Sequence, residues 1–142
     1  MHLFGWLVQY LIFTQSEMSL YLAIALGGSL GAVSRHWVQT FTHQWLGFGF
    51  PFGTLAVNVV GSLLMGFLSV ILVQRFQVAD ELKYGLLIGF LGSFTTFSSF
   101  AMDTLHLSDN GAILKAFSYI LLSLFGCLIG AWAGLITAKQ LI

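Results

Sequence analysis

Residues 84–102 read YGLLIGFLGSFTTFSSFAM, an apolar run that holds no charged side chain. A helix that crosses the hydrocarbon core of a bilayer needs about 20 predominantly apolar residues, and this run has that length. Its second half, GSFTTFSSF at residues 92–100, places one glycine and five hydroxyl side chains among three phenylalanines. The stretch therefore predicts a transmembrane segment in which polar groups interrupt the apolar pattern.

Three more apolar runs of spanning length lie on either side of this one, at residues 20–41, 54–73 and 113–138. The segment before the second run holds the only proline, Pro51, and the segment before the third run is the charged QVADELK at residues 77–83. The sequence thus predicts four spanning helices, with both chain ends on one side of the membrane.

The apolar stretch within residues 1–17 is too short to cross a bilayer. This segment also lacks the basic start of a signal peptide. We interpret them as an interfacial or frayed extension, with Met18 as an alternative start of the chain. Residues 18–142 are then a single four-helix transmembrane domain.

The composition supports a membrane protein and excludes several other classes. Of the 142 residues, 58% are hydrophobic and 7% are charged, whereas soluble domains carry about 25% charged residues. So few charges cannot cover a surface that faces water, which excludes a soluble enzyme, a nucleic-acid binder and a disordered tail. The one cysteine, Cys127, forms no internal disulfide and is interpreted as a small buried hydrophobe. The four histidines have no metal-ligand spacing.

The charges flanking the spans give almost no preferred orientation. Arg75, Lys83 and Lys139 fall on the side of the chain ends, against Arg35 and Lys115 on the other side. Orientation follows the bias of Lys and Arg near the ends of spans. Two interpretations stay open: a weak preference for cytoplasmic chain ends, or insertion in both orientations with antiparallel pairing of the copies.

Glycines at intervals of four residues predict close contacts between helices, because small side chains let helix backbones approach each other in lipid. The positions are Gly27 and Gly31, Gly85 and Gly89, and Gly126, Gly130 and Gly134.

Polar groups inside spans are costly and usually face a bundle interior or a wet cavity. Asn58 lies in the middle of the second span, where it either lines a transport pathway or forms a hydrogen bond between helices. The run at residues 92–100 either breaks the third helix or stays helical with its hydroxyls bonded to backbone carbonyls. A break would free carbonyl oxygens, which are ligands for a hard cation.

The fourth span carries Tyr119, Ser123 and Cys127 at intervals of four residues, which forms one polar stripe. Arg35 and Asp103, near the ends of the first and third runs, are interpreted as interfacial anchors. No acid lies deep in the first, second or fourth span, and no catalytic group is assembled, so an enzyme is not expected. Neutral donors and aromatic rings suit a small anion. Four helices are too few to enclose a pore, which predicts an oligomer.

The chain resembles the family of fluoride ion channels called Fluc or CrcB. The resemblance covers roughly residues 18–140 and rests on three motifs in the family's order: GGSLG at 27–31 followed by Arg35, GTLAVN at 53–58, and TTFSSF at 95–100. Ser93 departs from the family at a position where a second glycine is common, and Cys127 replaces a frequent hydroxyl.

The resemblance implies an all-α, four-span channel of the cell membrane with a broken third helix, which exports fluoride and so lowers its cytoplasmic concentration. It implies an antiparallel, dual-topology homodimer in membrane lipid, with two fluoride pathways at the interface and no nucleic-acid partner. The implied pathway residues are Arg35, Asn58, Thr96, Phe97, Ser99, Phe100, Tyr119 and Ser123. It also implies a central structural sodium ion, Na+, held by the backbone carbonyls of Gly92 and Thr95.

Two other functions are weighed against a fluoride channel. One is a small dual-topology multidrug exporter, which the missing buried acid disfavours. The other is an assembly subunit that transports nothing and uses its polar residues only for packing.

Overall fold

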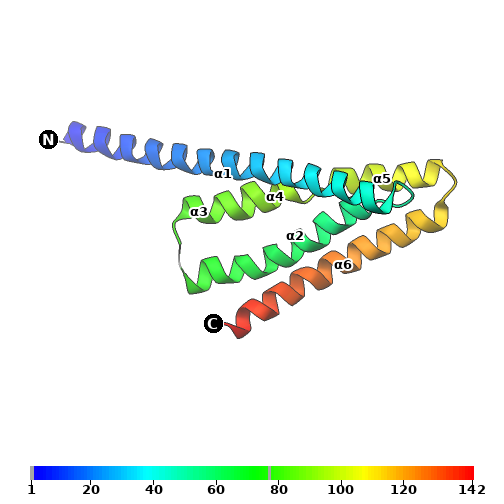
Figure 1. Ribbon diagram of the computed structural model, residues 1–142. Coiled ribbons are helices and arrows are strands. Elements are labelled where there is room, and N and C mark those ends of the chain that lie inside the picture. Colours follow the sequence, from blue (N-terminus) through cyan, green and yellow to red (C-terminus); the bar gives the residue numbers. More distant parts are fainter. Residues whose placement is uncertain (1, 77) are drawn as a thin grey trace.

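A computed structural model describes the backbone of residues 2–76 and 78–142 and the side chains of residues 17–76 and 78–142. All regular elements of the described backbone are helices, and none is a strand (Figure 1). Its elements are α1 (His2–Leu46), α2 (Phe52–Val70), the π-helical η1 (Ile71–Arg75), α3 (Asp80–Tyr84), the π-helical η2 (Gly85–Leu91), α4 (Gly92–Phe94), α5 (Phe97–Asp109) and α6 (Ile113–Gln140).

Four segments are long and apolar enough to cross a membrane, as the sequence predicts. They are Glu17–Leu46, Phe52–Arg75, Asp80–Asp109 and Ile113–Gln140. Each extends beyond its predicted bounds at one end or both, because helical hydrogen bonding continues through polar residues past the apolar run. Arg35 and Asp103 lie within α1 and α5, whose helical structure continues past both residues, and their role as interfacial anchors stays a prediction.

The predicted extension at residues 1–17 has no structural boundary with the first span. The backbone of α1 is continuous from His2 into the bundle, and its first turns project beyond the other helices (Figure 1). The division of the chain at residue 17 remains a prediction.

The helices pack most extensively as two pairs, α1 with η2 and α2 with α6. Both chain ends lie at the same end of the bundle (Figure 1). In the first pair, a Cβ placed on Gly27 would lie 2.0 Å from the Gly85 carbonyl oxygen, and one on Gly31 would lie 2.1 Å from the Phe90 oxygen. These backbones touch only because the side chains are absent, which confirms the close contacts predicted from the glycine spacing.

The α2–α6 pair provides a test of this packing. A Cβ on Gly134 would lie 2.1 Å from the Leu63 carbonyl oxygen, which belongs to rigid backbone. We expect Gly134→Ala to push the helices apart and lower the free energy of unfolding by about 1–3 kcal/mol. Thermal unfolding of the purified protein in detergent measures the effect. Gly49→Ala is the control, because its Cβ would meet only Lys115 Nζ at 3.9 Å, and equal melting of both variants would contradict the prediction.

Two extended residues interrupt the helical structure of the third span. The short helix α4 ends at Phe94, and α5 begins at Phe97. Between them, Thr95 has φ −80° and ψ 156° and Thr96 has φ −152° and ψ 116°, both extended. Thr96 then caps α5, with its side-chain oxygen accepting a hydrogen bond from the Ser99 N–H at 3.1 Å.

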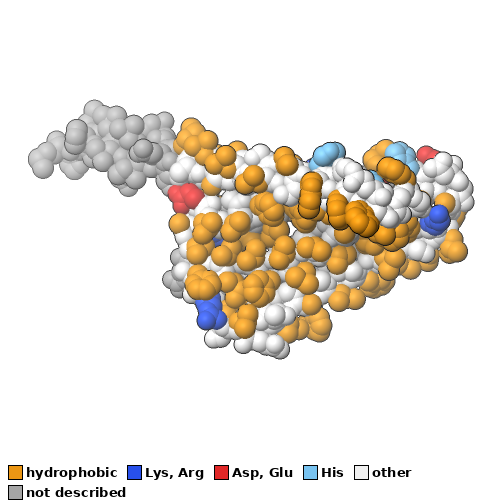
Figure 2. Space-filling model, viewed as in Figure 1, with side chains coloured by type: hydrophobic (Ala, Val, Ile, Leu, Met, Phe, Trp, Pro, Cys, Tyr) orange, Lys and Arg blue, Asp and Glu red, His pale blue; other side chains and the backbone are white. Residues whose placement is uncertain are grey.

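Most of the large apolar side chains lie on the outside of the molecule. Figure 2 shows hydrophobic side chains spread over the visible face, with charged ones near its ends. The few fully buried side chains include Val57, Leu91 and Tyr119. This distribution suits a chain surrounded by lipid, where an apolar exterior costs nothing.

Candidate functional site

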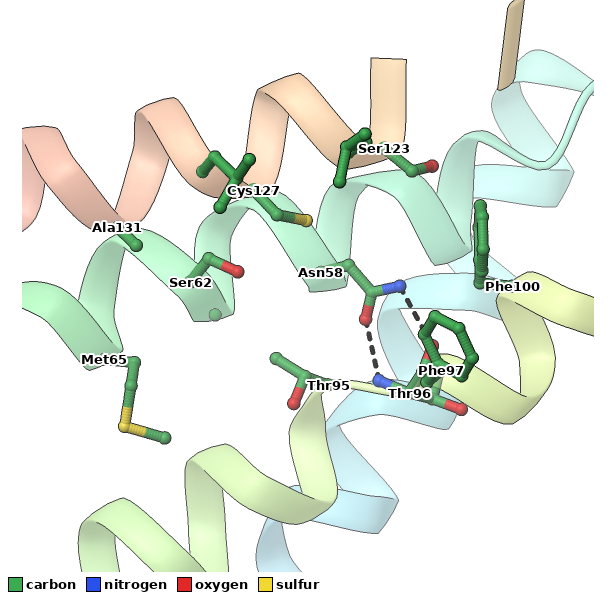
Figure 3. Close-up of a pocket in the computed structure, with 13 residues that line it drawn as sticks. Asn58, Ser62, Met65, Thr95, Thr96, Phe97, Phe100, Ser123, Cys127 and Ala131 are labelled. Carbon is green, nitrogen blue, oxygen red and sulfur yellow. Dashed lines mark hydrogen bonds between the residues drawn. The ribbon is translucent and has the colours of Figure 1, made fainter. Parts of the chain in front are cut away.

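The site centres on a two-point contact between Asn58 of α2 and the backbone of Thr96. The Thr96 N–H donates to Asn58 Oδ1 at 2.7 Å, and Asn58 Nδ2 donates to the Thr96 carbonyl at 3.0 Å (Figure 3). Both residues are buried, with exposed fractions of 9% for Asn58 and 7% for Thr96. An amide side chain has one donor and one acceptor edge, so it pairs with both polar groups of one residue.

This contact replaces hydrogen bonds that the extended backbone gives up. In a continuous α-helix the Thr96 N–H would bond the Gly92 carbonyl four residues earlier. Here that N–H is directed to Asn58 instead. Buried backbone groups need a partner, and Asn58 supplies it. A hydrogen bond between helices is therefore present at Asn58, and it leaves one amide hydrogen for another acceptor.

Hydroxyl groups gather at the start of α5. The Thr96 hydroxyl donates to Ser99 Oγ at 3.1 Å and lies 3.2 Å from Ser98 Oγ. Further back along the chain, the Thr95 hydroxyl donates to the Leu91 carbonyl at 3.0 Å. Thus the Thr95 side chain bonds back to η2, while the Thr96 side chain bonds to the first turn of α5.

A partly open cavity of about 400 Å³ lies between α2, α6 and residues 95–100. Its polar lining includes Asn58, Ser62, Thr95, Thr96 and Ser123, and its aromatic lining is Phe97 and Phe100 (Figure 3). Among the described residues, no charged side chain lines it. The cavity thus offers neutral polar groups and phenylalanine rings inside a membrane-spanning bundle.

The aromatic rings form a chain from the surface to the interior. The ring centroids of Phe97 and Phe100 lie 5.4 Å apart, and those of Phe100 and Tyr119 lie 5.3 Å apart. Phe50 meets Tyr119 edge-on at 5.5 Å. Phe97 is 80% exposed and Tyr119 is fully buried, so the chain of rings runs inward from an open end.

Two hydroxyls of α6 differ in their partners. The Tyr119 hydroxyl donates to Asp103 Oδ2 at 3.4 Å, which connects α6 to α5. Ser123 is 6% exposed, and its oxygen has no hydrogen-bond partner among the described residues. The Ser123 side chain thus lines the cavity, while its oxygen lies below the accessible surface.

Arg35 of α1 faces the two extended residues. Its Nη1 donates to the Thr95 carbonyl at 3.5 Å, the outer limit of a hydrogen bond. Gly92, one turn earlier, is exposed, and a Cβ on it would meet only the Leu87 oxygen at 3.8 Å. The two carbonyls named for sodium thus belong to one partly buried residue and one exposed residue.

The structure brings some of the predicted site residues into one cavity and leaves others outside its lining. Asn58, Thr96, Phe97, Phe100 and Ser123 line it, together with Thr95. Outside the lining are Arg35, Gly92, Ser99 and Tyr119. Phe50 could not be singled out from the residue pattern, because it precedes Pro51 in the linker and contacts Tyr119 only through the fold.

Comparison with known proteins identifies the family. The model of a family described as CrcB-like protein, Camphor Resistance (CrcB), matches residues 22–135. The chain belongs to the CrcB family. This membership confirms the resemblance that the three motifs indicate.

Relatives in the CrcB family are similar over most of this chain. A protein of Methylococcus capsulatus is 51% identical over 119 residues, which cover 84% of this chain and 52% of the relative. One of Geobacter sulfurreducens is 42% identical over 124 residues, which cover 87% of this chain and the whole relative. One of Legionella pneumophila is 43% identical over 122 residues, 86% of this chain and 91% of the relative. Each is named fluoride-specific ion channel FluC.

This chain spans about half the length of the Methylococcus capsulatus relative.

Four spanning segments together with membership of the CrcB family establish a multi-pass membrane protein. The expectation that the chain is not an enzyme is confirmed by a family whose relatives are named as ion channels.

Proposed function

We propose that this chain forms a fluoride-selective channel that lets fluoride leave the cell and so lowers its cytoplasmic concentration. The observation that carries the proposal is the cavity lined by neutral donors and phenylalanine rings in a chain similar to proteins named fluoride-specific ion channels. Fluoride loses strong hydration on entering a membrane, so its path has to supply donors and positive dipoles. A fixed positive charge would hold the ion too tightly.

In this proposal each group of the site has a stated role. The free amide hydrogen of Asn58 and the unpaired hydroxyl of Ser123 contact the ion directly. The ring edges of Phe97 and Phe100 carry the positive part of the ring quadrupole and bridge the stretch between hydroxyls. Thr96 and Ser99 hold the start of α5, Tyr119 continues the polar track, and Arg35 lies at the mouth of the pathway and draws anions in.

Release of fluoride from liposomes tests this function. Purified protein is reconstituted with internal fluoride or internal chloride, and release of each ion is followed with an ion-selective electrode. We expect rapid fluoride release and little chloride release. A multidrug exporter would instead require a proton gradient and an organic cation, and an assembly subunit would release neither anion. Absence of fluoride release from folded protein would overturn the proposal.

We also propose that two copies pair in opposite orientations to complete the pathway. In one copy the cavity is open on one side, Phe97 is 80% exposed and Gly92 is uncovered. A second copy would cover these groups and give each pathway a second wall. The near-even count of Lys and Arg on the two sides leaves both orientations accessible.

Antiparallel pairing predicts that a uniform orientation abolishes transport. Gln74 and Ala79 are exposed next to the charged segment on the side of the chain ends. We expect Gln74→Lys with Ala79→Lys to fix that side in the cytoplasm, which removes antiparallel dimers and fluoride release. Accessibility of a terminal tag from each side of the membrane reports orientation. Undiminished release from uniformly oriented protein would contradict the pairing.

We further propose that a structural sodium ion lies on the dimer axis. The donor chemistry fits, because sodium prefers oxygen ligands and the Gly92 carbonyl loses its usual bond from Thr96. Each copy would contribute the carbonyls of Gly92 and Thr95, and the ion would join the two copies. An experimental structure of the dimer with an oxygen-only ion shell on the axis is the expected result. An axis without ion density would contradict it.

A further inference from the structure

A second hollow of the molecule is an apolar groove of about 330 Å³ between α1 and the first part of the third span. Its walls are Ala23 and Leu30 of α1, Leu82 of α3, and Leu86 and Phe90 of η2. Leu30 and Leu82 are more than half exposed, so the groove is open to its surroundings. Among the described residues, Glu81 is the one charged side chain that lines it.

The groove extends from the membrane surface toward the middle of the bilayer. Glu81 is the second residue of the span that begins at Asp80, and α3 lies beside α1 at the end of the bundle that holds both chain ends (Figure 1). The Ser19 hydroxyl donates to Glu81 Oε1 at 2.8 Å. From Ser19 to Leu30 is three turns of α1, or about 16 Å. The hydrocarbon core is about 30 Å thick, so the groove has the depth of one leaflet.

Glu81 is the charge that this groove presents to a ligand. The nearby Lys83 pairs with Asp80, its Nζ lying 2.6 Å from Asp80 Oδ1, and it does not line the groove. The described ion pairs include no cation for Glu81, and its partner Ser19 is neutral. A carboxylate is best complemented by a cation that also donates hydrogen bonds. An apolar groove one leaflet deep that ends at such a carboxylate fits a lipid with an ammonium headgroup.

We propose that this groove binds a phospholipid with a primary ammonium headgroup, as in phosphatidylethanolamine. One acyl chain lies along Leu30, Leu86 and Phe90, and the ammonium group donates to Glu81. Phosphatidylcholine carries the same net charge, but its quaternary ammonium has no N–H to donate. Phosphatidylglycerol lacks an ammonium group, and its negative charge is repelled. The site is separate from the cavity of the proposed ion pathway and does not depend on fluoride transport.

The test measures which lipid the full-length protein retains. Dioleoyl phosphatidylethanolamine, phosphatidylcholine and phosphatidylglycerol are offered in equal amounts to protein in detergent, and native mass spectrometry counts the bound lipids and the copies of the chain. Glu81→Gln removes the charge and keeps an oxygen for Ser19, whereas Glu81→Asp keeps the charge. Glu17→Gln is the matched control, because Glu17 lies at the start of the first span and does not line the groove.

We expect wild type to retain about threefold to fivefold more phosphatidylethanolamine than phosphatidylcholine, the effect of an exposed ion pair. Glu81→Asp and Glu17→Gln should keep this preference, and Glu81→Gln should lose it while melting close to wild type. Equal retention of the two lipids by wild type, a preference for phosphatidylglycerol, or an unchanged preference in Glu81→Gln would overturn the proposal. A change in the number of copies without a change in lipid preference would assign the groove to a second copy, which would also overturn it.

Discussion

Replacement of Asn58 by alanine is expected to lower the free energy of unfolding by about 2–6 kcal/mol. The substitution leaves two buried groups of Thr96, its N–H and its carbonyl, without their partner. Each unsatisfied buried group costs about 1–3 kcal/mol. Thermal unfolding in detergent measures the loss, and fluoride release measures its consequence for the site.

Two companion variants separate the backbone contact from the general effect of a cavity mutation. Asn58→Asp keeps the oxygen that accepts from the Thr96 N–H but loses the donor to the Thr96 carbonyl. We expect an intermediate melting temperature and fluoride release below wild type, because a carboxylate repels the anion. Ser62→Ala, one turn further along α2 in the same cavity, should melt close to wild type. If Asn58→Ala melts like Ser62→Ala, the contact with Thr96 does not stabilise the fold.

The number of spans and their contact faces were predictable because both depend on local sequence. Apolar length alone determines which segments can cross a bilayer, and four segments do so in the structure. Glycine spacing marks the helix faces that approach closely, and the backbone contacts of Gly27, Gly31 and Gly134 lie on those faces. Periodicity shows which side of a helix is in contact and leaves the neighbouring helix unidentified.

The hydrogen-bond partners of the polar groups could not be predicted, because they depend on contacts between residues far apart in the sequence. Asn58 stood out as a costly polar group in the second span, but its partner is the backbone of a residue 38 positions later. Arg35 and Thr95 meet across 60 positions, and Tyr119 and Asp103 come from different helices. Such pairs are set by how the helices cross, so residue types alone left Asn58 with two interpretations.

The helices also extend past the apolar runs that predicted the spans. An apolar run measures the part of a helix that lies in hydrocarbon, whereas the helix continues while its backbone bonds continue. The first helix therefore continues past Arg35 to Leu46. Within the bundle, the Thr95 carbonyl accepts from the Arg35 guanidinium at 3.5 Å.

Isoleucine at Phe97 or Phe100 is expected to slow fluoride release roughly a hundredfold, which corresponds to about 3 kcal/mol at the barrier. Isoleucine keeps much of the apolar bulk but removes the ring quadrupole, and with it the positive edge that would face the anion in the proposed pathway. Phe97 is 80% exposed, so its replacement should change the stability of a single chain by about 0.5 kcal/mol or less. Phe100 packs against Tyr119 at 5.3 Å and should cost somewhat more.

Fluoride release and melting temperature together distinguish rings that line the ion pathway from rings that only pack. Phe125→Ile is the matched control, since Phe125 is 54% exposed on α6 and does not line the cavity. A conducting role predicts that Phe97→Ile and Phe125→Ile melt alike while only Phe97→Ile loses fluoride release. A packing role predicts the reverse, with lower melting temperatures and unchanged release. Because Phe97 has almost no packing to lose within one chain, a large loss of release without a change in melting would arise from the ring itself. If both Phe97→Ile and Phe100→Ile release fluoride at the wild-type rate, the aromatic pathway is wrong.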